Sequence, residues 1–211
     1  PGATAEDSWK GDIWSWGDDA RSRFQRLNYN PGGLVAVWAE QNTRAALFSA
    51  LKQRRVYGTS GTRIGLRVHA GRDIDEQVCE GPVHEQFEAA MGGALDSSRT
   101  GKPVFVVQAS MDRTPLSRID IVRGSLVDGS VREDVIPVFA DDKGREQVCV
   151  SWRDGSFQAA APAYWYVRAL EQPTPRWSRL DCGALGNCAQ IPEADRAIRE
   201  RAWSSPIWHL P

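Results

Sequence analysis

Three residues that could line a binding site follow a predicted buried strand. Glu40 ends the apolar run at residues 34–38, beside Trp38 and Asn42, and a helix comes next. Side chains at the carboxyl ends of strands in α/β barrels face the site. The spacing therefore predicts that Trp38, Glu40 and Asn42 form a pocket wall. The alternative for Asn42 is that it, or Thr43 next to it, caps the helix.

A short turn after that helix could complete the same wall through Thr59, Ser60 and Gly61. The turn lacks the Gly-x-Ser-x-Gly nucleophile elbow, and no His and acid are placed to activate Ser60. It follows a helix instead of preceding one, which weakens the case for a phosphate cradle. Glycine here is explained as well by a need for positive φ. The catalytic residues, if there are any, stay unknown from these motifs.

The histidines give no local metal signature. His69, His84 and His209 are far apart in sequence, and none belongs to a His-x-His or His-Glu-x-x-His arrangement. We therefore predict no metal ligand in this chain and interpret each histidine as structural or solvent-facing.

The four cysteines favour disulfides over zinc. Cys182 and Cys188 enclose a short loop with two glycines, which predicts a disulfide between them, whereas zinc would need two further soft ligands. Cys79 and Cys149 either form a second disulfide or remain as buried free thiols. A disulfide would place the protein in an oxidising compartment.

Composition and charge are those of an ordinary globular protein. The 211 residues carry a net charge of -1, with 41% hydrophobic residues, and no apolar run is long enough to cross a bilayer. The scattered basic residues argue against nucleic acid or an anionic membrane as the main partner. Nine tryptophans are unusual at this length. We expect them to pack the core, and the alternative is an aromatic platform for sugars.

The pattern along the chain changes from α/β to β near residue 61. The apolar strand at residues 34–38 is expected to be covered on both faces, and the helix after it has Leu47, Phe48 and Leu51 at helical spacing. From residue 63 the period is two, which predicts about seven strands of an antiparallel sandwich. The expected strands span residues 63–68, 102–108, 116–122, 135–139, 148–152, 163–170 and 205–210. A helix is expected at residues 85–94, and a surface helix or extended arm at 194–202.

Several long motifs, in order, resemble one bacterial family. They are PGGLVAVWAEQNTRAALFSALKQRRVYGTSG, RTPLSRIDIVRG, VCVSWRD, AYWYVRALEQPTPRWS and RERAWSSPIW. The family is a domain of unknown function similar to the polymerase and histidinol phosphatase (PHP) metallohydrolases, and the match covers its C-terminal part.

The resemblance implies an α+β fold class. Residues 1–61 would be the C-terminal end of a PHP-like α/β barrel, and residues 62–211 a β-sandwich domain with a short helical insertion and a C-terminal arm. The segment 1–30 resembles the interior of a longer chain, so we expect an N-terminal truncation. The metal ligands would lie upstream of Pro1, so none is assigned in this sequence.

For the longer protein, the resemblance implies metal-dependent hydrolysis of a phosphoester or related ester, with a divalent metal as cofactor. The expected partner of this chain is its own N-terminal metal-binding domain, or a second copy if the chain is truncated. Export to the periplasm or outside the cell is expected, and the chain alone is expected to be inactive. The alternative is a non-catalytic β-sandwich that binds a ligand or braces a neighbour.

Overall fold

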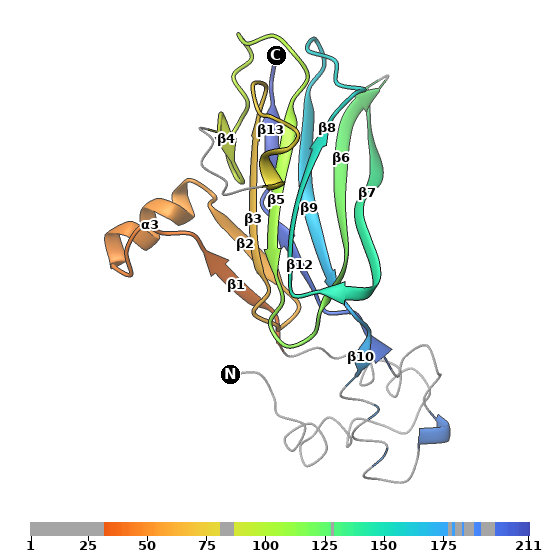
Figure 1. Cartoon of the computed structure of the whole chain (residues 1–211). Coiled ribbons are helices and arrows are strands. Elements are labelled where there is room, and N and C mark those ends of the chain that lie inside the picture. The colour runs from red at the N-terminus through yellow and green to blue at the C-terminus, as the bar shows by residue number, and fades with distance from the viewer. Residues whose placement is uncertain are drawn as a thin grey trace. The chain divides into compact units, whose positions relative to one another are not determined.

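The computed structural model describes residues 32–80, 87–127, 129–176, 179, 183, 188–190 and 197–211 (Figure 1). The chain divides into two compact units, one of residues 1–33 and 173–200 and a larger one of residues 34–172 and 201–211. In the smaller unit, β10 (Thr174–Pro175) pairs antiparallel with β11 (Ala197–Ile198), and Cys188–Gln190 form the 3-10 helix η3.

Two antiparallel sheets make up the larger unit. The first has the order β1-β2-β12-β9-β6-β7, and β13 also pairs with β9; the second has the order β4-β3-β5-β8. The strands of the first sheet are β1 (Leu34–Val37), β2 (Val56–Thr59), β12 (Arg201–Ser204), β9 (Ala163–Glu171), β6 (Leu116–Val127), β7 (Ser130–Arg145) and β13 (Ile207–His209). Those of the second are β4 (Ala89–Ala90), β3 (Gly65–Gly71), β5 (Val104–Ser110) and β8 (Gln147–Arg153).

The main core lies between these sheets and comes from alternate residues of their strands. Leu66 and Val68 of β3 are buried in the same cluster as Ile119 and Ile121 of β6. Trp165 of β9 is 1% exposed in this core, and its indole N–H donates to Asp154 Oδ2 at 3.0 Å. Alternation therefore places one face of each strand in a β-sandwich core, as the period of two predicts.

The predicted end of an α/β barrel is wrong. β1 and β2 flank α3 (Arg44–Lys52), the one α-helix in the described part of the chain, but they pair antiparallel, with Leu34 opposite Thr59. A βαβ unit would need parallel strands. β1 is also an edge strand, and Val35 is 72% exposed instead of covered on both faces. An apolar run of four residues fits either environment, so the pattern alone could not distinguish them. The described chain is mostly antiparallel β.

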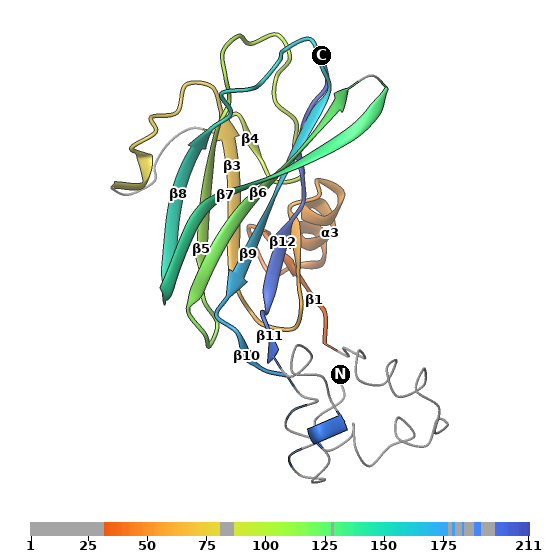
Figure 2. The ribbon, with the colours of Figure 1, turned by 90° about the vertical axis from the view of Figure 1, so that its right-hand side faces the viewer.

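The segment of residues 34–55, here called the β1–α3 segment, extends away from the sandwich (Figures 1 and 2). Its helix begins at Thr43, whose Oγ1 accepts a hydrogen bond from the Ala46 N–H at 3.3 Å. Thr43, and not Asn42, is therefore the cap. The helix ends at Lys52, and Arg54, which has a left-handed φ of 57°, turns the chain back toward β2.

A second, smaller core covers part of the outer face of the four-stranded sheet. Val104 and Val106 of β5 pack there against Ile74 and Val78, from the connection between β3 and β4. A disulfide between Cys79 and Cys149, whose Cα atoms are 5.5 Å apart, ties this connection to β8. The pairing of Cys79 with Cys149 is thus the correct one of the two alternatives. Cys182 lies outside the described residues, so the Cys182–Cys188 bridge stays a prediction.

Two predicted elements near the sheets have other structures. The expected helix at 85–94 is wrong over its described part, residues 87–94, where β4 and a tight turn lie. The expected surface helix or arm at 194–202 instead contributes β12, which pairs with both β2 and β9 inside the first sheet. The division of the chain at residue 61 stays a prediction.

Candidate functional site

A cavity of about 420 Å³ lies where the β1–α3 segment meets the outer face of β3. We call it the groove. Three short stretches and one single residue line it: the chain after β1, the residue that precedes β2, the middle of β3, and the end of β4. The lining residues are Trp38, Ala39, Glu40, Arg55, Arg67, Val68, His69, Ala90 and Met91.

Trp38 connects the β1–α3 segment to the sheet and forms an aromatic wall. Its indole N–H donates to the carbonyl of Leu66 at 2.8 Å, which fixes the ring against β3. The Arg67 guanidinium carbon lies 3.9 Å from the centroid of the Trp38 ring. This is cation–π geometry, and it covers one face of the guanidinium while the hydrogen-bonding edge remains.

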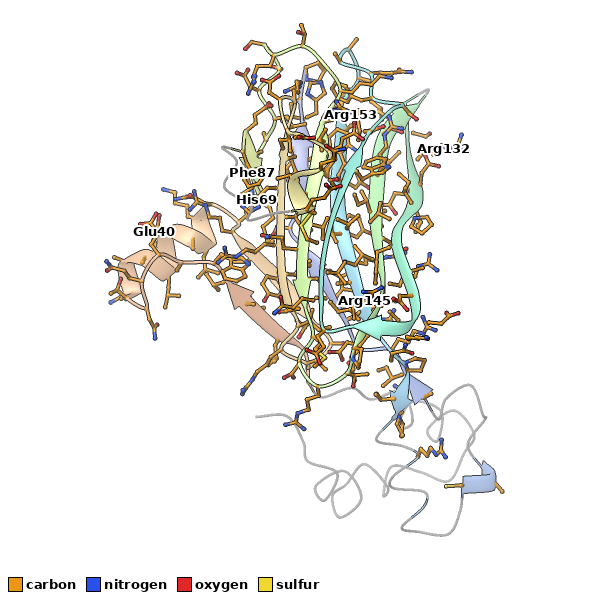
Figure 3. All side chains as sticks on the ribbon, viewed as in Figure 1. Glu40, His69, Phe87, Arg132, Arg145 and Arg153 are labelled. Carbon is orange, nitrogen blue, oxygen red and sulfur yellow. A yellow bond between two sulfur atoms is a disulfide. The ribbon has the colours of Figure 1, made fainter. Side chains whose placement is uncertain are left out.

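His69 lies on the same face of β3 as Arg67, two residues further along. Its ring stacks on Phe87, with centroids 4.3 Å apart and planes 16° from parallel (Figure 3). Burial lowers the pKa of His69, and the positive charges of Arg67 and Arg55 lower it further. The imidazole is therefore neutral near pH 7 and offers one N–H and one unprotonated nitrogen.

Arg55 is held in place by its backbone. Its carbonyl accepts a hydrogen bond from the Trp38 N–H at 2.9 Å, and its own N–H donates to the Ala50 carbonyl at 2.9 Å. The preceding residue, Arg54, donates from Nε to the Gly92 carbonyl at 2.9 Å. Only glycine fits at position 92, because a Cβ there would lie 2.2 Å from the Arg54 carbonyl oxygen. This close contact fixes the end of the β1–α3 segment, and Arg55 with it.

The groove has an excess of positive charge. Neither Arg55 nor Arg67 forms an ion pair with any residue that the structure describes, and the same holds for Glu40. With His69 neutral, two guanidinium groups face one carboxylate. Figure 3 shows Glu40 out on the β1–α3 segment, away from His69 and Phe87. Glu40 therefore lies at the rim of the groove, on the side away from His69, and it also lines a smaller hollow together with Arg55.

A second hollow of about 540 Å³ continues along the outer face of the four-stranded sheet. Trp38 and Arg67 line both hollows, and the second adds three polar side chains, those of Gln108, Ser110 and Gln147. An elongated ligand could therefore extend from the groove along this polar surface.

The structure brings together only part of the predicted pocket wall. Trp38 and Glu40 line the groove, but Asn42 is not among the lining residues. Thr59, Ser60 and Gly61 lie at the other end of β2. There, Thr59 Oγ1 donates to the Thr62 carbonyl at 2.6 Å, and the Arg201 N–H donates to Ser60 Oγ at 2.9 Å. Gly61 has a φ of 131°, which explains the glycine. A functional role for any of the six stays a prediction.

Sequence reasoning missed the arginines, His69 and Phe87. The available signal was the alternation of β3, which puts positions 67 and 69 on the same face. Arg55 and Phe87 come from separate loops, so only tertiary structure reveals them. Of the other histidines, His209 is fully buried and lies 2.9 Å from the Ala159 carbonyl, and His84 is outside the described residues.

The tryptophans do not form an exposed pair in the described part of the chain. Of the five placed there, Trp165 is buried, Trp38 and two others are partly buried, and Trp203 is 37% exposed. Trp9, Trp14, Trp16 and Trp177 lie outside it. An aromatic platform for sugars gains no support from these positions.

The described residues contain no group of three or more His, Cys, Asp or Glu side chains arranged to hold a metal ion. Within the same residues, no helix has the length and apolar character needed to span a membrane.

Comparison with known proteins gives a family without a known activity. No curated protein and no solved structure matched the chain. The profile of one family matched almost all of it, over residues 3–145 and 137–211. That family is described as "Protein of unknown function (DUF3604)", and the chain belongs to it.

Proposed function

We propose that this chain is the C-terminal, non-catalytic portion of a PHP-like metal-dependent hydrolase that acts on phosphoesters or related esters. The remainder of that protein would pack against the β1–α3 segment. The motif resemblance supports the reaction class, and an unusual surface of the segment supports the packing.

That surface is apolar. Nine large hydrophobic residues in the described part of the chain are exposed, and four of them lie on this short segment: Leu34, Val35, Phe48 and Leu51. Val35 is 72% exposed and Phe48 67%. Full burial of one such side chain is worth roughly 1.5–3 kcal/mol. A surface of this kind favours a protein partner.

The strand edge of the segment favours the same conclusion. β1 pairs with β2 on one side, and no described strand pairs with its other side. An open edge with apolar side chains invites further pairing. We take the occupant to be the N-terminal, metal-binding portion of the same protein, and a second copy of this chain is the alternative.

In this arrangement the groove would lie beside the catalytic portion, because Trp38 and Glu40 directly follow β1. A divalent metal held by the N-terminal portion would lower the pKa of a bound water and polarise the ester. This chain would supply wall residues only. The Cys79–Cys149 disulfide supports export to the periplasm or the cell exterior, where disulfides persist.

Hydrogen exchange and an ester assay on two proteins test the proposal. One is the 211-residue chain and the other is a longer protein that also contains the N-terminal portion. In the longer protein we expect slower exchange of the β1 amides and Mn²⁺-dependent hydrolysis of p-nitrophenyl phosphate. The β6–β7 hairpin, which also exposes Val131, is the matched control and should exchange equally in both.

Two results would overturn the proposal. Equal exchange of β1 in both proteins would exclude packing of the N-terminal portion there. Hydrolysis by the 211-residue chain alone would exclude a non-catalytic role. If the longer protein shows no hydrolysis while β1 is protected, the alternative of a bracing module takes its place.

A further inference from the structure

We propose that Arg55, Arg67 and His69 form a binding subsite for an oxyanion, namely a phosphate, sulfate or carboxylate group of a small organic ligand. The inference goes beyond the proposed hydrolase, because it concerns binding by this chain alone and does not depend on a catalytic partner.

The two arginines of the groove lack a counter-ion among the described residues. Other arginines on these sheets pair closely with carboxylates: Arg118 and Arg168 lie 2.6 and 3.1 Å from Asp120, and Arg123 lies 3.0 Å from Asp154. Arg55 and Arg67 line one cavity and have no such partner among the described residues. Both also lie close enough to His69 to disfavour its protonation. Both positive charges therefore lie at the same groove, near His69.

The subsite is already organised around the Arg67 side chain. Arg67 lies on the Trp38 ring, which is itself fixed by the hydrogen bond to the Leu66 carbonyl. Two backbone hydrogen bonds fix the main chain at Arg55, whose side chain is exposed. A guanidinium presents several N–H donors in a plane that matches an oxyanion. Because Arg67 already stacks on Trp38, its side chain loses little conformational entropy on binding.

The polarity of the groove lining suits a small anionic ligand. His69 is neutral and stacked on Phe87, so it adds a directed hydrogen bond without a further charge. Trp38 gives an apolar wall on which the body of a ligand would lie. Glu40, at the rim, repels an anion. This arrangement fits a small ester or acid that carries one anionic group.

The experiment is a titration of the 211-residue chain with inorganic phosphate, sulfate and acetate at constant ionic strength. Binding is followed through the NMR signals of the arginine side chains. We expect Arg67→Ala to weaken binding of the preferred anion about tenfold or more, since charge-assisted hydrogen bonds are lost. Arg67→Lys should retain part of the affinity. Glu40→Gln should increase it, because a repelling carboxylate is removed.

Arg132→Ala is the matched control. Arg132 is an exposed arginine on the β6–β7 hairpin, far from His69 in Figure 3, and its loss should leave binding unchanged. Unchanged binding by Arg67→Ala would overturn the proposal, as would an equal loss in Arg132→Ala, since that would indicate diffuse charge attraction. Tighter binding of one anion than of the other two would show whether the subsite recognises a phosphate, a sulfate or a carboxylate group. Failure here leaves the hydrolase proposal intact, because no hydrolysis is measured.

Discussion

The ring of Tyr164 occupies the space that a side chain at position 124 would fill. The two residues are opposite each other on β9 and β6, and a Cβ on Gly124 would lie 2.1 Å from Cζ of Tyr164. The Tyr164 hydroxyl donates to Glu133 Oε1 at 2.6 Å, and its ring centroid is 5.4 Å from that of Trp208. Because Gly124 has no side chain, the Tyr164 ring on β9 can lie over β6 and contact Glu133 of β7 and Trp208 of β13.

Replacement of this glycine should destabilise the sheet. Gly124→Ala would force the Tyr164 ring from its place, and we expect the free energy of unfolding to fall by about 1–3 kcal/mol, as in other overpacked sites. Urea denaturation measures the change. Gly58→Ala is the control, because a Cβ there would meet only the Leu34 carbonyl oxygen at 3.9 Å. Equal stability of the two variants would contradict the packing argument.

The hydroxyl of Tyr164 should lose its proton only at unusually high pH. Its hydrogen bond to Glu133 raises its pKa to about 12, from an ordinary value of 10.0. Glu133→Gln removes the charged acceptor and should bring the pKa back toward the ordinary value. The ultraviolet absorbance of tyrosinate measures this, with Glu76→Gln as a control. The idea fails if the titration curves of wild type and Glu133→Gln coincide.

Stability should depend on pH through His69. Its pKa is lowered in the folded state by burial and by Arg67 and Arg55, so the unfolded chain takes up the proton first as pH falls. Stability is therefore expected to decrease as pH drops below the ordinary histidine value of 6.5 toward the folded pKa. His69→Gln should have a flatter pH profile in this window, measured by denaturation at several pH values. A steeper pH dependence of stability in the variant would contradict the predicted contribution of His69.

Loss of the Cys79–Cys149 bridge should lower stability substantially. The two residues are 70 apart in sequence, and in the chain-entropy model a loop of this size contributes about 4 kcal/mol. The double variant Cys79→Ala/Cys149→Ala tests this bridge without touching Cys182 or Cys188. We expect its free energy of unfolding to fall by about that amount. A loss of stability below about 1 kcal/mol would show that the smaller core holds the connection to the sheet without the bridge.

The alternation of apolar and polar residues along the sequence was enough to predict many strands. The expected strands at 63–68, 102–108, 116–122, 148–152 and 163–170 coincide largely with β3, β5, β6, β8 and β9, because each alternates between a core face and an outer face. The same alternation did not show which strands pair with each other. β1 has the composition of a buried strand but lies at an edge, and β2 pairs on its other side with β12. Those contacts join residues more than a hundred positions apart.

The candidate site was predictable only in part for the same reason. Trp38 and Glu40 were found because they follow a strand directly. Arg67 and His69 share a face of β3, but nothing local shows that this face meets the β1–α3 segment. Arg55 and Phe87 reach the groove through loops whose positions depend on the whole fold.

The position of β12 between β2 and β9 has a consequence for how the protein is made. Its backbone joins the strands near residue 57 to those near residue 169, and no described strand takes its place. A nascent chain could form the hairpin of β6 and β7 early, but the first sheet would stay in two pieces until residues 201–204 had left the ribosome. Closure of this sheet therefore waits for every one of its strands except β13 to be made, and until then the open edges of β2 and β9 would need protection from pairing with other chains.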